Sequence, residues 1–279
     1  MPLTDTFTKL LVRGLLAGLV AGLLAGAVAF VIGEPHIEAA IAIEEAASAP
    51  AEHAHGTAEP EEHAHDAGTD VQGHGESEAA ASEGHSHGDD ALVSRDGQRV
   101  GLFLATTLAG LALGAIFAVV AHYARRVTDV AGPVLALTLA GLGWLAIEAV
   151  PFFKYPANPP AVGDPDTINQ RTWLWLAAVV LGLFAVAVAT YVARLVAATG
   201  YLSVRVAAPV LAFLVIVGIG YVAMPGVNEV GPDFPATLLW EFRISSLAIQ
   251  ATLWLALGLG FAFLTERSGK QAERALAFR

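Results

Sequence analysis

The chain has 279 residues, of which 55% are hydrophobic and 15% charged, and its mean hydropathy is +0.59. This composition excludes an ordinary soluble domain and indicates an integral membrane protein. Because there is no cysteine, disulfides, thiolate metal sites and cysteine nucleophiles are excluded, and any metal must be held by nitrogen and oxygen. The net charge of −11 comes from one internal segment and does not indicate a nucleic-acid partner.

Six apolar runs of about twenty residues, the length that crosses a bilayer as a helix, follow one another along the chain. They cover residues 10–32, 100–123, 131–151, 173–195, 206–224 and 244–264. The predicted fold is therefore an all-α integral membrane protein in which six helices form three hairpins. The predicted segments are a first transmembrane helix at 1–33, a juxtamembrane helix at 34–47, a polar loop at 48–98, a bundle of five helices at 99–265 and a cytoplasmic tail at 266–279.

The first run carries a glycine at every fourth position. These residues are Gly14, Gly18, Gly22 and Gly26. A face of this kind lets another helix backbone approach closely, which is how helices associate where lipid supplies no hydrophobic drive. Packing within the chain is favoured here over a contact between two copies.

The end of the first run is predicted to be a helix break at Gly33-Glu34-Pro35, because Pro35 suits the first turn of a new helix. An alternative interpretation is a signal peptide cleaved after Ala27-Val28-Ala29. The run is longer than a usual signal sequence, and its glycine face indicates a packed helix, so the transmembrane interpretation is favoured.

The loop at residues 48–98, called the His-rich loop below, is the most polar part of the chain. Residues 34–96 hold 16 of the 26 acidic residues and one arginine, which gives this stretch a net charge of −15. Without aromatic residues it cannot bury enough apolar surface to offset chain entropy, so we predict disorder in the absence of a ligand. Seven of the nine histidines lie in the loop: His53, His55, His63, His65, His74, His85 and His87.

Six of these histidines form three His-x-His pairs, at 53–55, 63–65 and 85–87. Residues two apart in an extended chain face the same side, so each pair can present two imidazoles to one ion. Imidazole suits zinc, copper, nickel and cobalt, and a flexible chain does not select among them. Metal binding is favoured over a merely solvated linker.

A second set of acidic and histidine residues lies beside the membrane, on the predicted juxtamembrane helix. It is either a metal relay or a solvated helix face: Glu34, His36, Glu38, Glu44 and Glu45.

The distribution of basic residues predicts the orientation of the chain. With six spans and a cytoplasmic N-terminus, ten lysines and arginines fall inside and five outside, which agrees with the positive-inside rule. Both termini are then cytoplasmic. The His-rich loop and two proline-rich loops, at 152–166 and 224–235, are extracytoplasmic.

A third set of polar residues lies in or beside the outer ends of the later runs and is predicted to line a transport pathway: Glu148, Asn158, Asp164, Asn228, Glu229, Glu241 and Arg243. Carboxylates inside a membrane are costly and usually face a cavity or a partner. For Glu148 the alternative is an interfacial position paired with Lys154 or Arg243.

No motif for nucleotide hydrolysis or for a catalytic centre occurs in the sequence. The stretch Ser268-Gly269-Lys270-Gln271 is not a P-loop. An enzyme is therefore not predicted.

Several stretches outside the His-rich loop form a specific pattern: Gly33-Glu34-Pro35 followed by residues 40–46, the Pro/Asn-rich string at 155–165, and the stretches at 225–230, 234–236 and 239–243. Together they resemble the CbtA family, the predicted cobalt transporter subunit. The resemblance implies cobalt uptake that serves cobalamin synthesis, and a small one-helix, histidine-bearing partner, CbtB. The family's usual description of about five spans makes five helices the alternative to six.

The leading hypothesis is a cobalt uptake subunit in the cell membrane that collects the ion on the His-rich loop; no cofactor is expected beyond the transported or bound metal. A zinc or nickel permease is the alternative within the same class. A metal-buffering or metal-sensing membrane protein without transport is the alternative from another class.

Overall fold

The structure is a computed structural model that describes residues 6–48 and 94–277, so the seven histidines of the His-rich loop lie outside the described residues. All regular elements in these two stretches are helical. The long helices are α1 (Phe7–Val28), α2 (Glu34–Ser48), α3 (Arg95–Ala124), α4 (Gly132–Trp144), α6 (Ile168–Leu195), α7 (Leu202–Ala223) and α8 (Ala236–Ala277). Shorter elements are π turns at Ala29–Gly33 and Leu145–Ala149, α5 (Val150–Lys154) and a 3-10 turn at Pro165–Thr167.

Six helical stretches among the described residues are long and apolar enough to cross a membrane, which confirms the predicted fold class. They are Phe7–Ala47, Arg95–Ala124, Gly132–Lys154, Ile168–Leu195, Leu202–Ala223 and Ala236–Gln271. The first and last are much longer than a bilayer requires. The end of α2 and the end of α8 therefore project beyond the apolar layer on opposite sides.

The predicted helix break at Gly33-Glu34-Pro35 is wrong. Helix α1 continues through the π turn Ala29–Gly33 directly into α2, and Pro35 lies inside the continuous helix. Pro151 follows the second π turn, Leu145–Ala149, at the same spacing. A proline ring clashes with the carbonyl four residues before it, and a local switch to wider π bonding changes the path of that carbonyl. We attribute the uninterrupted helices to these two π turns.

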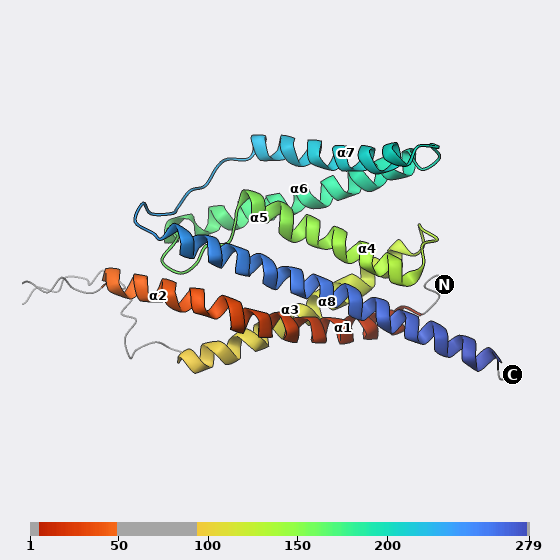
Figure 1. The fold of residues 1–279 in the computed structure, drawn as a ribbon, viewed down its shortest axis with the longest axis horizontal. Coiled ribbons are helices and arrows are strands. Elements are labelled where there is room, and N and C mark those ends of the chain that lie inside the picture. Colours follow the sequence, from red (N-terminus) through yellow and green to blue (C-terminus); the bar gives the residue numbers. More distant parts are fainter. Residues whose placement is uncertain (1–5, 49–93, 278–279) are drawn as a thin grey trace, which may run out of the picture.

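The helices run up and down so that the chain returns to the same end of the bundle. Figure 1 shows the start of α1 and the end of α8 at one end. At the opposite end lie the end of α2, the start of α3 and the two proline-rich connections, α5 to α6 and α7 to α8. We call this second end the polar-loop end.

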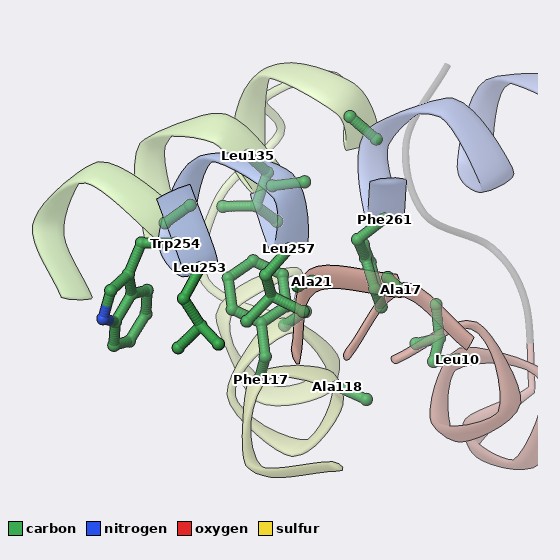
Figure 2. Packing of buried hydrophobic residues seen from close by; sticks show 14 of the residues in the cluster. Leu10, Ala17, Ala21, Phe117, Ala118, Leu135, Leu253, Trp254, Leu257 and Phe261 are labelled. Atoms are coloured by element: carbon green, nitrogen blue, oxygen red, sulfur yellow. The ribbon is translucent and has the colours of Figure 1, made fainter. Parts of the chain in front are cut away.

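The core of the bundle is formed by α1, α3, α4 and α8. Figure 2 shows Phe117 of α3 and Phe261 of α8 near the centre of this cluster, with ring centroids 5.2 Å apart in an edge-to-face arrangement. Leu257 and Leu10 are fully buried beside them. Alanines fill many of the remaining core positions, because small residues allow the close helix approach that packing in a membrane requires.

Helix α3 meets the glycine face of α1 along its length. Gly14 lies against Gly114, and Gly18 against Gly110, so closely that a Cβ atom at any of these positions would overlap the opposite backbone. Gly22 meets the backbone of Thr106 in the same way. The contact is therefore made by main chain against main chain.

Helices α6 and α7 form a peripheral hairpin. Gly182 of α6 lies directly against the backbone of Ala146 in the second π turn. Helix α7 has no buried residue and packs on α6. The hairpin thereby places the first turns of α6 beside α5 and the proline-rich loops, where the candidate site lies.

Candidate functional site

A cavity of about 500 Å³ opens at the polar-loop end, between the second π turn, α5, the start of α6, the loop at 224–235 and the first turns of α8. Five of the seven predicted pathway residues line it: Glu148, Asn158, Asn228, Glu229 and Arg243. The other two, Asp164 and Glu241, do not line it. The tertiary structure thus brings together polar residues from four separate segments of the chain.

One face of α8 forms a wall of this cavity. Arg243, Ser246, Leu247 and Gln250 recur at the three- and four-residue spacing that places side chains on the same side of a helix. Trp254 continues the same face one turn further into the membrane. This wall is polar at the outer end and becomes apolar toward the bundle core, to which Trp254 belongs.

Glu229 is the residue that joins the two proline-rich loops. Its Oε2 lies 2.9 Å from Nη1 of Arg171 in α6, and its Oε1 accepts a hydrogen bond from the hydroxyl of Thr167. The Glu229 side chain is only 8% exposed, against 31% for Arg171. The guanidinium and the hydroxyl compensate for the hydration that a carboxylate this enclosed has lost.

Arg243 anchors the loop after α5. Its Nη2 donates to Oδ1 of Asn158 over 2.9 Å, and its Nε donates to the carbonyl oxygen of Ala157 over 3.3 Å. No carboxylate within the described ranges forms an ion pair with Arg243. Glu241, two residues earlier on α8, instead lies 3.8 Å from Nδ1 of His36. The guanidinium therefore keeps its charge facing the cavity.

Glu148 lies in the second π turn, at the inner end of the cavity. Nε1 of Trp254 donates to Oε1 of Glu148 over a long 3.4 Å. The alternative pairing with Lys154 is not seen, because Lys154 Nζ donates to the carbonyl oxygen of Tyr221 over 2.9 Å. In the part of the chain that the structure describes, Glu148 has no ion-pair partner and faces the cavity.

Tyr155 closes the rim of the cavity. Its hydroxyl donates to the carbonyl oxygen of Pro225 over 2.8 Å, which joins the start of one proline-rich loop to the start of the other. Partial burial raises the pKa of the Tyr155 hydroxyl above its ordinary value near 10. The hydroxyl therefore remains a hydrogen-bond donor throughout the physiological pH range.

A second cavity of about 550 Å³ lies between the end of α2 and the two proline-rich loops. Glu44 of α2 and Asp233 of the loop before α8 are its acidic lining residues, and Gly163 contributes backbone. A Cβ atom at Gly163 would lie 2.9 Å from Nη1 of Arg171 and 3.6 Å from Oε2 of Glu229. Gly163 thus lies between the second cavity and the ion pair at the first.

Replacing Gly163 by alanine is expected to lower the free energy of unfolding by about 1–2 kcal/mol, because φ at this position is +142° and the added methyl group displaces Arg171. Thermal unfolding of the purified protein in detergent measures the change. The matched control is Gly231→Ala, in the facing loop, where a Cβ atom meets nothing within 4 Å. Equal effects of the two substitutions would contradict the close contact at Gly163.

The predicted relay residues on α2 are engaged with α3 or separated from one another. Glu34, a buried residue, accepts from Nη2 of Arg95 over 2.8 Å and lies 3.5 Å from Nε of Arg99. Glu38 pairs with both arginines. Glu44 lines the second cavity, and Glu45 is exposed. Residues 6–48 and 94–277 contain no group of three histidine or acidic side chains that could hold a metal ion.

These contacts join the first turns of α3 to the first turns of α2. The chain leaves α2 after Ser48 and returns at Ser94, which caps α3 by accepting a hydrogen bond from the backbone nitrogen of Gly97. The Glu34–Arg95 pair holds the start of α3, where the His-rich loop ends, against the start of α2. Sequence alone gave no reason to connect these two residues, which are 61 positions apart.

Sequence reasoning did not identify Arg171, Thr167, Ser246, Gln250 or Trp254 as site residues. Ser246 and Gln250 lie four positions apart inside an apolar run, and polar side chains at that spacing on a membrane helix indicate one polar face. Arg171, directly before the fourth run, carried no comparable pattern. Its role depends on a loop 58 positions further along the chain.

The fold and the site define a multi-pass α-helical membrane protein with a charged cavity at the end where its polar loops meet. Within this class, the chain belongs to the CbtA family: the family model described as a probable cobalt transporter subunit (CbtA) matches residues 7–266, nearly the whole chain. Membership of a transporter-subunit family agrees with the prediction that the chain is not an enzyme. No curated protein and no solved structure matches the chain.

Proposed function

We propose that this protein is the membrane subunit of a cobalt uptake transporter, which collects the ion on the His-rich loop and leads it through the cavity at the polar-loop end. The observation that carries this proposal is the convergence of Glu148, Asn158, Asn228, Glu229 and Arg243 on one cavity. These residues come from segments up to 95 positions apart in a family whose described role is cobalt transport.

The proposed route begins at the base of the His-rich loop. Helix α2 ends at Ser48, where the loop starts, and the second cavity lies against its last turns with the carboxylates of Glu44 and Asp233. Gly163 lies between that cavity and the Arg171–Glu229 pair. Imidazoles at the mouth and the carboxylates of Glu44 and Asp233 beside it are compatible with holding the metal without trapping it.

The proposed orientation places the polar-loop end outside the cell membrane and both termini in the cytoplasm. The arrangement of the helices in Figure 1 and the ten-to-five excess of basic residues on the terminal side support it. Because the chain has no cysteine, Ala58→Cys and Ser268→Cys each introduce a single labelling site. A membrane-impermeant maleimide applied to intact cells should label the first and not the second, and the reverse result would overturn the orientation.

A transport assay tests the function directly. Cells that lack their other cobalt importers should accumulate cobalt when they express this chain together with a small CbtB-like membrane protein, the proposed partner. Unchanged accumulation, with and without that partner, would contradict the proposal. Competition with zinc and nickel at equal concentration separates the cobalt hypothesis from a zinc or nickel permease.

Removal of residues 50–90 is expected to reduce cobalt uptake several-fold when the external metal is scarce, and to leave uptake unchanged when it is abundant. A flexible collector raises the local metal concentration without forming the pathway. Uptake measured over a range of cobalt concentrations checks this result. Complete loss of function at every concentration would instead favour the metal-buffering or sensing hypothesis.

The contribution of the His-rich loop should also depend on pH. Imidazole binds a metal only when neutral, so the advantage of the intact loop is expected at pH 7.5 and should be lost as the pH falls through about 6.5. Uptake at scarce cobalt, with and without residues 50–90, measures this advantage at each pH. A constant advantage down to pH 5 would show that histidines do not provide it.

A further inference from the structure

We infer that the 500 Å³ cavity accepts the metal as a complex with a small carboxylate-bearing ligand, and not as a bare ion. This inference rests on the proposed transport function and specifies the form of its substrate. The charges, the ligand set and the shape of the cavity each support it.

The charges lining the cavity do not suit an isolated divalent cation. Its walls carry two guanidinium groups, Arg171 and Arg243, and two carboxylates, Glu148 and Glu229. Arg171 and Glu229 neutralise each other at 2.9 Å. A bare dication would then meet one carboxylate that is not in an ion pair and the unpaired positive charge of Arg243. At short range in a partly desolvated cavity, repulsion between like charges is strong.

The described part of the chain also offers few imidazole or carboxylate ligands to a bare ion at this cavity. Divalent transition ions take four to six nitrogen or oxygen ligands. No group of three histidine or acidic side chains that could hold a metal occurs in residues 6–48 and 94–277. At the cavity Glu148 supplies one carboxylate outside an ion pair, and the remaining oxygen donors, such as Asn228, Ser246 and Gln250, are neutral. A small chelating molecule brings further charged donor atoms with it.

The cavity is polarised along the direction of α8. Arg243 lies near the start of α8, and Trp254, the donor to Glu148, lies 11 residues later, which corresponds to about 16 Å along the helix. A cationic group therefore occupies the outer part of the cavity and a carboxylate the inner part. A metal complex with a free carboxylate at one end has the complementary arrangement of charges.

Arg243 is suited to bind that free carboxylate. Its hydrogen bonds to Asn158 and Ala157 use Nη2 and Nε, which fixes the guanidinium plane and leaves Nη1 without a partner among the residues described. A positioned guanidinium binds a carboxylate with charge-assisted hydrogen bonds and selects its planar shape. The cavity volume lies in the range of sites that enclose small molecules, and Phe152, Tyr155 and Trp175 supply apolar surface around it.

The experiment measures cobalt bound to the full-length purified protein at one fixed free Co²⁺ activity while the concentration of citrate is raised. If only the bare ion binds, occupancy depends on free Co²⁺ alone and stays constant, which would overturn the inference. If the complex binds, occupancy rises with citrate. The His-rich loop contributes a constant background, because its imidazoles respond to the free ion.

The variant Arg243→Gln should reduce the citrate-dependent affinity about 10- to 100-fold, the effect of losing one hydrogen-bonded charge. Arg243→Lys should restore part of it, because the charge remains without the guanidinium shape. The control is Arg205→Gln on an exposed position of α7, away from the cavity. Thermal unfolding of each variant verifies folding. Citrate-dependent cobalt binding that is equal in the parent protein and in the three variants would overturn the assignment to this cavity.

Transport in proteoliposomes distinguishes failure of this inference from failure of the proposed function. Cobalt uptake that depends on the free Co²⁺ concentration and does not change with citrate would contradict the inference and leave the transport function intact. Absence of uptake under every condition, with the CbtB-like partner present, would contradict the transport function itself. Binding of citrate without cobalt, at the same affinity as with it, would show an anion site and overturn the metal-complex assignment.

Discussion

Replacing Gly18 by leucine is expected to separate α1 from α3 and to lower the free energy of unfolding by about 3 kcal/mol or more. The added side chain would overlap the backbone of Gly110, and backbone cannot rotate away as a side chain can. Because α1 also supplies Leu10, Ala17 and Ala21 to the core, the loss extends to the packing of α8. Thermal unfolding and size-exclusion chromatography in detergent measure the result.

The control for this prediction is Gly141→Leu. Gly141 lies within α4, in another membrane-spanning stretch, and a Cβ atom there meets nothing within 4 Å. The two substitutions have the same change in volume and hydrophobicity, so a difference between them isolates the contact with α3. If both variants unfold at the temperature of the parent protein, the close approach of α1 and α3 is wrong.

Replacing Glu229 by alanine is expected to reduce cobalt uptake at least about tenfold and to destabilise the protein by about 3 kcal/mol. The substitution leaves Arg171 as an uncompensated charge at the cavity, and it releases the loop at 224–235 from Thr167. We place the stability cost at the lower end for a broken ion pair, because 31% of the Arg171 side chain remains exposed. Uptake assays and thermal unfolding provide the two measurements.

A double-mutant cycle separates the two effects of Glu229. In Glu229→Ala combined with Arg171→Gln, the unpaired charge is absent, so most of the lost stability should return. Uptake should stay low, because the loop is still not held. Asp166→Ala, which removes an exposed carboxylate from the neighbouring loop, is the control and should change neither property. Additive effects of Glu229→Ala and Arg171→Gln on stability would show that the two residues do not interact.

The limits of the sequence-based prediction are clearest at the helix ends. The fourth apolar run is predicted to begin at residue 173, whereas α6 begins at Ile168. The sixth run is predicted to begin at residue 244, whereas α8 begins at Ala236. Hydropathy detects only the part of a helix that lies in the apolar layer. The polar first turns of α6 and α8 continue the same hydrogen-bonding pattern beyond that layer, and these turns carry Arg171 and Arg243 into the cavity.

The relay residues on α2 show a second limit. Their composition is that of a metal site, and nothing local indicates that Glu34 and Glu38 pair with Arg95 and Arg99 of α3. An acidic cluster has the same appearance in sequence whether a cation or an arginine neutralises it. The partner becomes known only when the first turns of α2 and α3 are placed side by side.

Run length and hydropathy were sufficient to predict six membrane-spanning helices, because the thickness and polarity of a bilayer act on each segment separately. The regular spacing of Gly14, Gly18, Gly22 and Gly26 likewise marked a close-packing face. These properties are local, so they can be read from the amino-acid sequence alone.

Only the packed bundle decided which polar side chains meet. Glu229 contacts Arg171, Arg243 contacts Asn158, and Glu148 contacts Trp254 because helices and loops distant in sequence lie side by side. The two π turns, which carry the chain past Pro35 and Pro151 without a break, were not evident in the sequence either. The charge balance of the cavity results from these non-local contacts, and the proposed form of the transported metal depends on it.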